Sequence, residues 1–258
     1  MRTVLVTGAS SGIGRACAER LARNGWRVVA GVRNAGDGPE GTEELLLDVA
    51  NVGTIEIGDV DALVNNAGIA VAGPLEYLPL DELRRQLEVN VLGQLAVTQA
   101  LLPKLRAARG RVVFIGSIAG RSSLPFLGAY AISKFGLEAM ADALRVELRP
   151  FGIAVSIVEP GTIATPIWTK PQPVADAIDD EGLALYGDRL EAFRRAAADR
   201  AAHGVPADEV AKVVEHALTA ERPRTRYLVG PDAKRRAVLQ RLPDRLRDRI
   251  LERFIFVS

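Results

Sequence analysis

Short apolar runs alternate with amphipathic helical patterns along most of the chain. Apolar residues recur at helical spacing over residues 12–24, 80–106, 128–150 and 206–220. Runs rich in β-branched or other apolar residues precede or follow these segments and begin at Thr3, Arg27, Glu44, Ala62, Arg111, Ile153 and Arg226. Such alternation is typical of a parallel sheet covered by helices on both faces. It predicts a single doubly wound α/β domain over residues 1–258, with a sheet of about seven strands.

Two segments depart from the alternation. Residues 162–205 are a long excursion rich in Pro, Ala and charge, which predicts a partly helical substrate lid because long excursions in compact domains often cover a site. Beyond it, residues 232–255 have an amphipathic pattern and predict a C-terminal helix. This helix could cover the domain, contact a second subunit or lie on a membrane surface, and the mixed charge of its polar face favours the first two.

Composition narrows the class of protein. The 258 residues are 48% hydrophobic and 25% charged, with a net charge of +1, values typical of a soluble globular protein and unlike a nucleic-acid-binding one. The sequence has neither a signal-peptide pattern at its start nor a transmembrane segment, so we expect a cytoplasmic protein. The single cysteine, Cys17, is expected to be a buried packing thiol, and the separated His203 and His216 predict no metal site.

A glycine-rich turn follows the first predicted strand. The stretch TGASSGIG, Thr7–Gly14, leads into the first predicted helix. Glycines allow a tight turn and a close approach of the backbone, so that amide groups and the helix N-terminus can face a pyrophosphate. This favours a Rossmann-like dinucleotide site over a merely structural turn.

The end of the second predicted strand indicates which dinucleotide is bound. Sites that prefer NAD place an acidic residue there to hold the ribose hydroxyls. The stretch VVAGVRN has Arg33 instead, and an arginine suits a 2′-phosphate through a forked, charge-assisted contact. We therefore expect NADP(H) to be preferred over NAD(H), although Arg33 could also be a solvated surface residue.

A tyrosine and a lysine lie four positions apart in GAYAISKFGLEAM. At this spacing Tyr130 and Lys134 share one helix face and should be neighbours. A nearby cation favours the phenolate, so Lys134 is expected to lower the pKa of Tyr130 and make it a candidate general acid or base. A packed ring beside a solvated ammonium is the alternative.

Six motifs in order resemble the short-chain dehydrogenase/reductase family. They span residues 7–166 and are TGASSGIG, NNAG at 65–68, Asn90 in EVNVLG, Ser117 in FIGSIAG, the Tyr130/Lys134 pair and PGTIATP at 160–166. The resemblance implies that Ser117 holds the substrate oxygen, that Tyr130 transfers its proton, and that Lys134 holds the nicotinamide ribose. It also implies that Asn90 continues a proton relay. The nicotinamide would supply the hydride, and the protein would position and polarise the reactants.

The resemblance also implies a set of cofactor contacts. Asp48 would contact the adenine edge, residues 66–68 would border the adenosine ribose, and Ile163 and Thr165 would anchor the carboxamide. Asp48 could instead cap a turn, and Asn65 could brace neighbouring strands. The cofactor-binding residues expected on this basis are Gly8, Ser10, Ser11, Gly12, Ile13, Gly14, Arg33, Asp48, Val49, Asn66, Ala67, Gly68, Asn90, Tyr130, Lys134, Pro160, Gly161, Ile163 and Thr165.

One stretch departs from the family. The segment between Asp48 and Asn65 is short, so the helix usual between the third and fourth strands is expected to be reduced or missing. The family also implies a homo-oligomer, a dimer or tetramer, built through the helices at 80–106 and 128–150.

Apolar residues surround the expected substrate site. They would suit a bulky hydrophobic ketone or secondary alcohol, or they could pack the lid onto its own core. They are Ile167, Trp168, Leu183, Leu185, Tyr186 and Phe193 in the lid, and Leu124, Phe126 and Leu127 after Ser117.

Together these patterns predict an NADP(H)-dependent oxidoreductase that interconverts a carbonyl and an alcohol. A noncatalytic NADP(H)-binding sensor or scaffold is the alternative, and the complete set of Asn90, Ser117, Tyr130 and Lys134 speaks against it. A lyase or epimerase that oxidises its substrate transiently is a third interpretation. Enzymes of that kind usually have a different glycine spacing and a larger C-terminal substrate domain, which this chain lacks.

Overall fold

A seven-stranded sheet forms the centre of the protein in a computed structural model that describes residues 1–168 and 178–256. Every adjacent pair of strands is parallel, in the order β3-β2-β1-β4-β5-β6-β7. This confirms the doubly wound, Rossmann-like α/β fold. The strands are β1 (Thr3–Thr7), β2 (Arg27–Val32), β3 (Glu43–Leu46), β4 (Ala62–Asn65), β5 (Arg111–Ile115), β6 (Ala154–Pro160) and β7 (Arg226–Val229).

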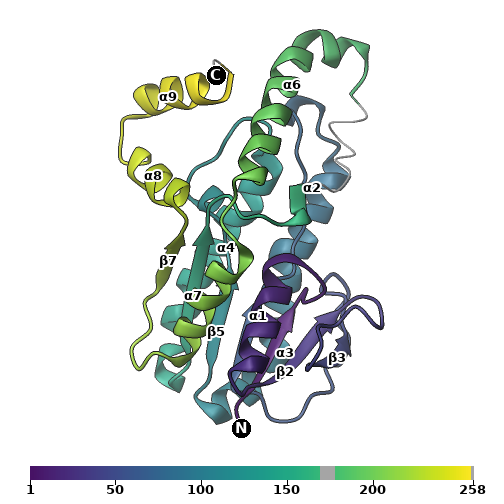
Figure 1. Cartoon of the computed structure of the whole chain (residues 1–258), viewed down its shortest axis with the longest axis vertical. Coiled ribbons are helices and arrows are strands. Elements are labelled where there is room, and N and C mark those ends of the chain that lie inside the picture. The colour runs from purple at the N-terminus through teal and green to yellow at the C-terminus, as the bar shows by residue number, and fades with distance from the viewer. Residues whose placement is uncertain (169–177, 257–258) are drawn as a thin grey trace.

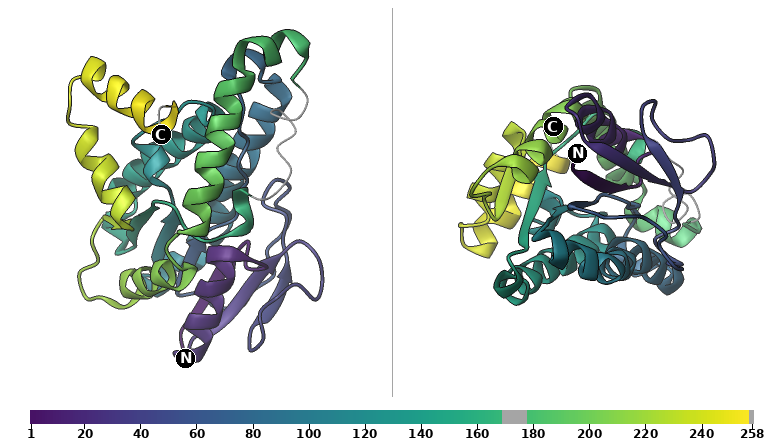
Figure 2. Two further views of the ribbon diagram at one scale, coloured as in Figure 1. Left: turned by 45° about the horizontal axis from the view of Figure 1, so that its top comes forward. Right: turned by 90° about the horizontal axis from the view of Figure 1, so that it is seen from below.

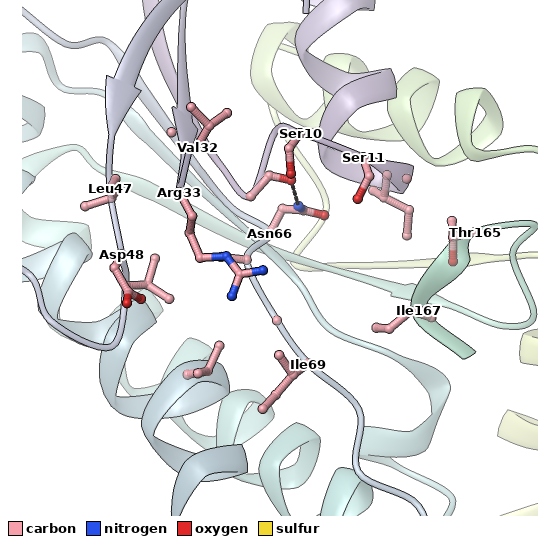
Figure 3. Close-up of a pocket in the computed structure, with 18 of the residues that line it drawn as sticks. Ser10, Ser11, Val32, Arg33, Leu47, Asp48, Asn66, Ile69, Thr165 and Ile167 are labelled. Carbon is pink, nitrogen blue, oxygen red and sulfur yellow. Dashed lines mark hydrogen bonds between the residues drawn. The ribbon is translucent and has the colours of Figure 1, made fainter. Parts of the chain in front are cut away.

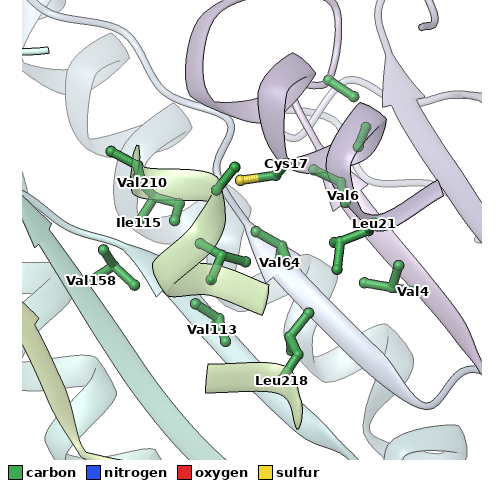
Figure 4. Packing of buried hydrophobic residues seen from close by; sticks show 14 of the residues in the cluster. Val4, Val6, Cys17, Leu21, Val64, Val113, Ile115, Val158, Val210 and Leu218 are labelled. Carbon is green, nitrogen blue, oxygen red and sulfur yellow. The ribbon is translucent and has the colours of Figure 1, made fainter. Parts of the chain in front are cut away.

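Helices α1 (Gly12–Arg23) and α7 (Ala207–Thr219) cover one face of the sheet (Figures 1 and 2). Between them and the strands lies an apolar cluster that includes Val6, Leu21 and Val210 (Figure 4). Cys17 is fully buried in this cluster, and burial raises the pKa of its thiol to about 12. The predicted packing role of Cys17 therefore agrees with its surroundings.

The opposite face carries α2 (Leu80–Leu87), α3 (Gly93–Ala108) and α4 (Gly128–Glu147). A second cluster packs α3 and α4 onto the sheet and includes Leu5, Leu101, Phe114 and Leu137, while Leu83 of α2 packs in a small cluster with Val71 and Ala129. The helix predicted over residues 80–106 is interrupted between α2 and α3 by a π-helical turn, η2 (Glu88–Leu92). Such turns often mark functional positions, and Asn90 lies in this one.

No helix joins β3 to β4 among the described residues, as the short connecting segment predicts. Short helical turns complete other connections: η1 (Leu75–Tyr77), η3 (Ile118–Gly120), η4 (Arg149–Phe151) and η5 (Pro166–Trp168). Among residues 1–168 and 178–256, no helix has both the length and the apolar character needed to cross a membrane.

The predicted lid contains one long helix, α6 (Asp180–Ala202). Phe193 of this helix packs edge-to-face on Phe126, with 5.6 Å between the ring centroids, and Tyr186 contacts the same ring. Leu124 and Leu127 are buried in the same cluster, so these side chains pack the lid onto the body of the protein. Leu183 and Leu185 are exposed instead. The side chain of Trp168 and residues 169–177 lie outside the described part of the chain.

The prediction of one C-terminal helix over residues 232–255 was wrong. The structure has two, α8 (Pro231–Leu239) and α9 (Asp244–Phe256). Pro243 separates them, because a proline has no N–H to continue the helix and its ring crowds the preceding turn. Leu251 of α9 joins the cluster around Phe126 and Phe193, so α9 covers the domain, one of the three uses that the sequence leaves open.

Candidate active site

A cleft opens at the carboxyl ends of β1, β2 and β4 (Figure 3). The glycine loop forms one side of it. Gly8 and Gly12 adopt left-handed φ angles of +65° and +56°, which favour glycine. At Gly14 an added Cβ would lie 2.2 Å from the Gly8 carbonyl oxygen, so only glycine allows the turn and the helix start to approach this closely.

A buried hydroxyl connects the glycine loop to the end of β4. Thr7 Oγ1 accepts hydrogen bonds from the backbone N–H groups of Asn66 and Ala67, both at 3.0 Å. The Asn66 side chain donates to the carbonyl oxygens of Thr7 and Gly8 at 2.9 and 3.1 Å. These bonds fix the loop that carries Asn66, Ala67 and Gly68 against the glycine turn.

Arg33 extends from the end of β2 into the cleft (Figure 3). Asp48 borders the cleft after β3, and its Oδ1 accepts a hydrogen bond from the backbone N–H of Ala50 at 3.0 Å. Asp48 therefore caps a turn, as one interpretation of the sequence expects, and still lines the cleft. The start of α3 approaches Val49 closely, because Gly93 has no side chain and an added Cβ would lie 2.3 Å from the Val49 carbonyl oxygen.

A second, smaller pocket adjoins the cleft and contains the predicted catalytic residues Ser117, Tyr130 and Lys134. Ser117 follows β5, and its Oγ accepts a hydrogen bond from the Ala119 N–H at 3.1 Å. Lys134 Nζ donates to the carbonyl oxygen of Ile115 at 2.8 Å and lies 5.7 Å from the centre of the Tyr130 ring. The structure thus brings together residues from two elements, as predicted.

The expectation that Lys134 lowers the pKa of Tyr130 does not hold in this structure. Burial raises the pKa of Tyr130 to about 12, although the hydrogen bond with Ser117 and the charge of Arg236 act in the opposite direction. Burial also lowers the pKa of Lys134 to about 8, while Glu138 raises it. The spacing along the helix reveals that the two side chains are neighbours, but not that both are buried away from water. Here burial is the largest influence on both pKa values.

Asn90 lies fully buried behind the pockets. Its Oδ1 accepts from the backbone N–H of Ile69 at 2.9 Å, and its Nδ2 donates to Ile69 O and Ser133 Oγ, each at 3.0 Å. Ser133 Oγ in turn donates to Tyr130 O at 2.7 Å. Asn90 therefore braces the strand-end loop against α4. Asn65 likewise braces the core through a 2.8 Å bond to Thr98.

Most of the predicted cofactor residues line the two pockets. Thr165 borders both, while Pro160, Gly161 and Ile163 border the smaller one. Gly14 and Asn90 lie buried behind the linings. The two pockets share Ile13, Asn66, Gly68, Ile69, Thr165 and Ile167. The glycine turn and its backbone amides, beside a pocket that contains a lysine, fit a dinucleotide whose nicotinamide end reaches Tyr130.

Sequence reasoning missed several charged groups near the site. Glu138 lies one helical turn beyond Lys134, and its carboxylate pairs with Arg226 at 3.1 Å. Burial and the neighbouring Glu159 raise the pKa of Glu138. The i,i+4 spacing from Lys134 could have revealed Glu138, whereas the position of Arg236 depends on how α8 packs.

Comparisons with known proteins identify the family. The family model described as short chain dehydrogenase matches residues 2–51 and 46–174. The chain belongs to the short-chain dehydrogenase/reductase family. It is thus an NAD(P)-dependent oxidoreductase that acts on alcohol or carbonyl groups.

Individual short-chain dehydrogenases/reductases resemble the chain along most of its length. It is 42% identical to a 3-amino-tetrahydro-pyrrolizinone reductase of Xenorhabdus hominickii, over 90% of this chain and 88% of that protein. It is 35% identical to an NADPH-dependent 3-dehydrocapnine reductase of Ornithobacterium rhinotracheale, over 97% and 96%. A short-chain dehydrogenase from Streptomyces avermitilis has a similar structure, with a TM-score of 0.78, 30% identity and coverage of 98% and 95%.

Proposed function

We propose that this protein transfers a hydride between NADP(H) and a carbonyl or secondary alcohol, with Tyr130 as the general acid or base. The observation that carries the proposal is the position of Ser117, Tyr130 and Lys134 in one pocket that opens into the glycine-loop cleft. All three are buried, at 9%, 7% and 4% exposure. Buried donors of this kind stabilise developing charge more strongly than donors in water.

A nicotinamide held at this site would supply or accept the hydride. In the reducing direction, Ser117 donates a hydrogen bond to the carbonyl oxygen, and Tyr130 donates its phenolic proton to that oxygen as the alcohol forms. Lys134 Nζ lies 5.7 Å from the centre of the Tyr130 ring, where it would hold the nicotinamide ribose. Asn90 fixes the backbone between the two pockets and holds α4 in place.

The preference for NADP(H) rests on Arg33. Its guanidinium extends into the cleft at the end of β2 (Figure 3), where it would form a forked contact with a 2′-phosphate. The NADPH-dependent reductase among the relatives supports the same choice. We expect Arg33→Ala to weaken NADPH binding at least about tenfold and to change NADH binding little. Tighter binding of NADH than of NADPH by the wild-type protein would contradict the preference.

The substrate is proposed to have a bulky hydrophobic body. Three isoleucines that are not assigned to the cofactor, Ile69, Ile115 and Ile167, line the pocket around Ser117 and Tyr130, beside Ile13 and Ile163. Such a lining favours an apolar group over a sugar. Phe193 of the lid and Phe126 of the loop after Ser117 pack in one apolar cluster and do not line this pocket, so the body of the substrate would meet mainly these isoleucines.

We further propose a homo-oligomer that forms through α3 and α4. Large apolar side chains on and beside these helices are exposed, including Leu92, Ile132, Phe135, Val146 and Phe151. Exposed apolar groups in one region favour a protein interface. The mass of the purified protein in solution, measured by light scattering after gel filtration, tests this proposal.

The function is tested by following NADPH and NADH consumption with a panel of steroid, retinoid, aliphatic and sugar carbonyls, together with oxidation of the corresponding alcohols. The proposal expects turnover with NADPH and with the bulky apolar compounds. Turnover of small polar carbonyls alone would refute the substrate class. Binding of NADPH without consumption in either direction would refute the enzymatic function.

A further inference from the structure

Three buried amide side chains lie along one helical stretch behind the two pockets. They are Gln86 of α2, Asn90 of η2 and Gln94 of α3, called the amide row below, and all three are fully buried. Their spacing of four residues exceeds the 3.6 residues of an α-helical turn. The wider π-helical turn η2 takes up part of this excess, so the three side chains can face the same neighbouring segment.

The segment that the amide row faces continues from the end of β4. Asn90 forms two hydrogen bonds with Ile69, one to its N–H and one to its carbonyl oxygen. Gln86 Nε2 donates to the same carbonyl oxygen at 2.7 Å. Gln86 Oε1 accepts from the Val71 N–H, also at 2.7 Å. Ile69 is therefore held at both its backbone N–H and its carbonyl oxygen.

The third amide holds the segment nearer to β4. Gln94 Nε2 donates to the carbonyl oxygen of Ala67 at 2.9 Å. Gln94 Oε1 is buried and has no hydrogen-bond partner within residues 1–168 and 178–256, and an unpaired buried acceptor is unfavourable. The contribution of Gln94 thus lies in its bond to Ala67. The backbone groups bound by the amide row belong to residues 67, 69 and 71, which alternate as along one edge of a β-strand.

The residues held by the amide row line different parts of the site. Ala67 lines the nucleotide cleft, whereas Ile69 lines both the cleft and the pocket of Ser117 and Tyr130 (Figure 3). Ile69 therefore borders the place where the nicotinamide would meet the substrate. Gln94 controls the backbone beside the nucleotide, and the bonds of Gln86 control the boundary between the two pockets.

We propose that Gln86 and Gln94 are positioning residues, Gln86 for hydride transfer and Gln94 for nucleotide binding. The inference rests on the proposed function and adds to it two residues that are not among the described residues lining either pocket. A displacement of about 1 Å in a reacting group can slow a reaction about a hundredfold. Loss of the Gln86 bonds should therefore affect the rate, and loss of the Gln94 bond should affect the affinity for NADP(H).

Methionine substitutions test the two residues separately. Methionine is about as long as glutamine but lacks its amide donor and acceptor. The variants are Gln86→Met and Gln94→Met. The matched control is Gln99→Met, because Gln99 is an exposed glutamine of α3. The measurements are kcat and KM for reduction of a carbonyl, the Kd for NADPH, the Tm, and the isotope effect on kcat with NADPH deuterated at the transferred position.

The two variants are expected to fail in different ways. Gln86→Met should lower kcat at least about tenfold, with an isotope effect no smaller than that of the wild type and a Kd for NADPH changed less than about threefold. Gln94→Met should raise the Kd for NADPH at least about tenfold, with kcat at saturating NADPH changed less than about threefold. Gln99→Met should keep the wild-type values.

A merely structural role would give another result. If Gln86→Met and Gln94→Met lower the Tm but leave kcat and Kd within about threefold of the wild type, the amide row only supports the fold and the inference is overturned. Equal losses of kcat and of NADPH affinity in both variants would overturn it too, because the two residues would then have no separate roles.

Binding measurements separate this inference from the proposed function. A wild-type protein that binds NADPH but consumes none in either direction would refute the oxidoreductase function alone. Calorimetry with NADP⁺ then compares the wild type with Gln94→Met, and it does the same if Gln86→Met fails to fold. Binding at least about tenfold weaker in Gln94→Met would support the positioning role, whereas unchanged binding would overturn it.

Discussion

Replacing Thr7 by valine should lower the stability of the folded protein and weaken nucleotide binding. Thr7 is fully buried, and its Oγ1 accepts two backbone hydrogen bonds, from Asn66 and Ala67, and donates to Val64 O at 3.4 Å. Valine preserves the shape of the side chain but removes the oxygen. The two N–H groups then lose their partner inside the protein.

The size of the effect follows from those two bonds. A buried donor left unpaired costs about 1–3 kcal/mol. Because Asn66 and Ala67 are only partly buried, water can satisfy part of the loss, and we expect a total of about 2–4 kcal/mol. For a chain of this length that corresponds to a fall in Tm of roughly 4–16 °C.

Urea denaturation of Thr7→Val and Thr7→Ser provides the assay. Serine keeps the oxygen and deletes a buried methyl, at a cost of about 1 kcal/mol. Thr7→Val should therefore be the less stable variant at an unchanged m-value, and it should also bind NADPH more weakly than Thr7→Ser. Equal stability of the two variants, or a valine variant as stable as the wild type, would refute the role assigned to Thr7 Oγ1.

Two further changes probe the glycine loop and Lys134. Gly14→Ala should abolish measurable NADPH binding and lower stability, because its Cβ would lie 2.2 Å from the Gly8 carbonyl oxygen. The control is Gly187→Ala on α6, where a Cβ meets open space, and this change should leave NADPH binding unchanged and stability unchanged or higher. Titration calorimetry measures the binding of NADPH to the two variants, and thermal melts measure their stability. NADPH binding to the free protein should weaken as the pH rises through about 8, since a lysine with this lowered pKa is charged below and neutral above it. Lys134→Met should bind weakly at every pH, and a wild-type affinity independent of pH between about 7 and 9 would contradict this role of Lys134.

The sequence predicted the strands well because buried parallel strands are continuous apolar runs. β1, β2 and β5 carry almost only apolar side chains, and all seven predicted runs form strands. The C-terminal helix was less predictable, because leucines continue at helical spacing across Pro243. There the proline outweighed the apolar pattern.

The candidate site was predictable where its residues are close in sequence. Tyr130 and Lys134 share a helix face, and Gly8, Gly12 and Gly14 share one turn. Burial was not predictable, so the expected direction of the Tyr130 pKa was wrong. Contacts across long separations were also invisible, since Arg236 and Ser122 lie 114 residues apart and meet only after α8 packs beside η3.

The central claim is that Tyr130 transfers the proton while the protein moves a hydride between NADP(H) and a carbonyl. The most direct test compares NADPH oxidation by the wild-type protein and by Tyr130→Phe, with the substrate that the wild type reduces fastest. Phenylalanine keeps the ring and removes only the hydroxyl. The account predicts a fall in kcat of at least about a hundredfold, with the Kd for NADPH changed less than about threefold. A Tyr130→Phe protein that keeps more than about a tenth of the wild-type kcat would contradict it.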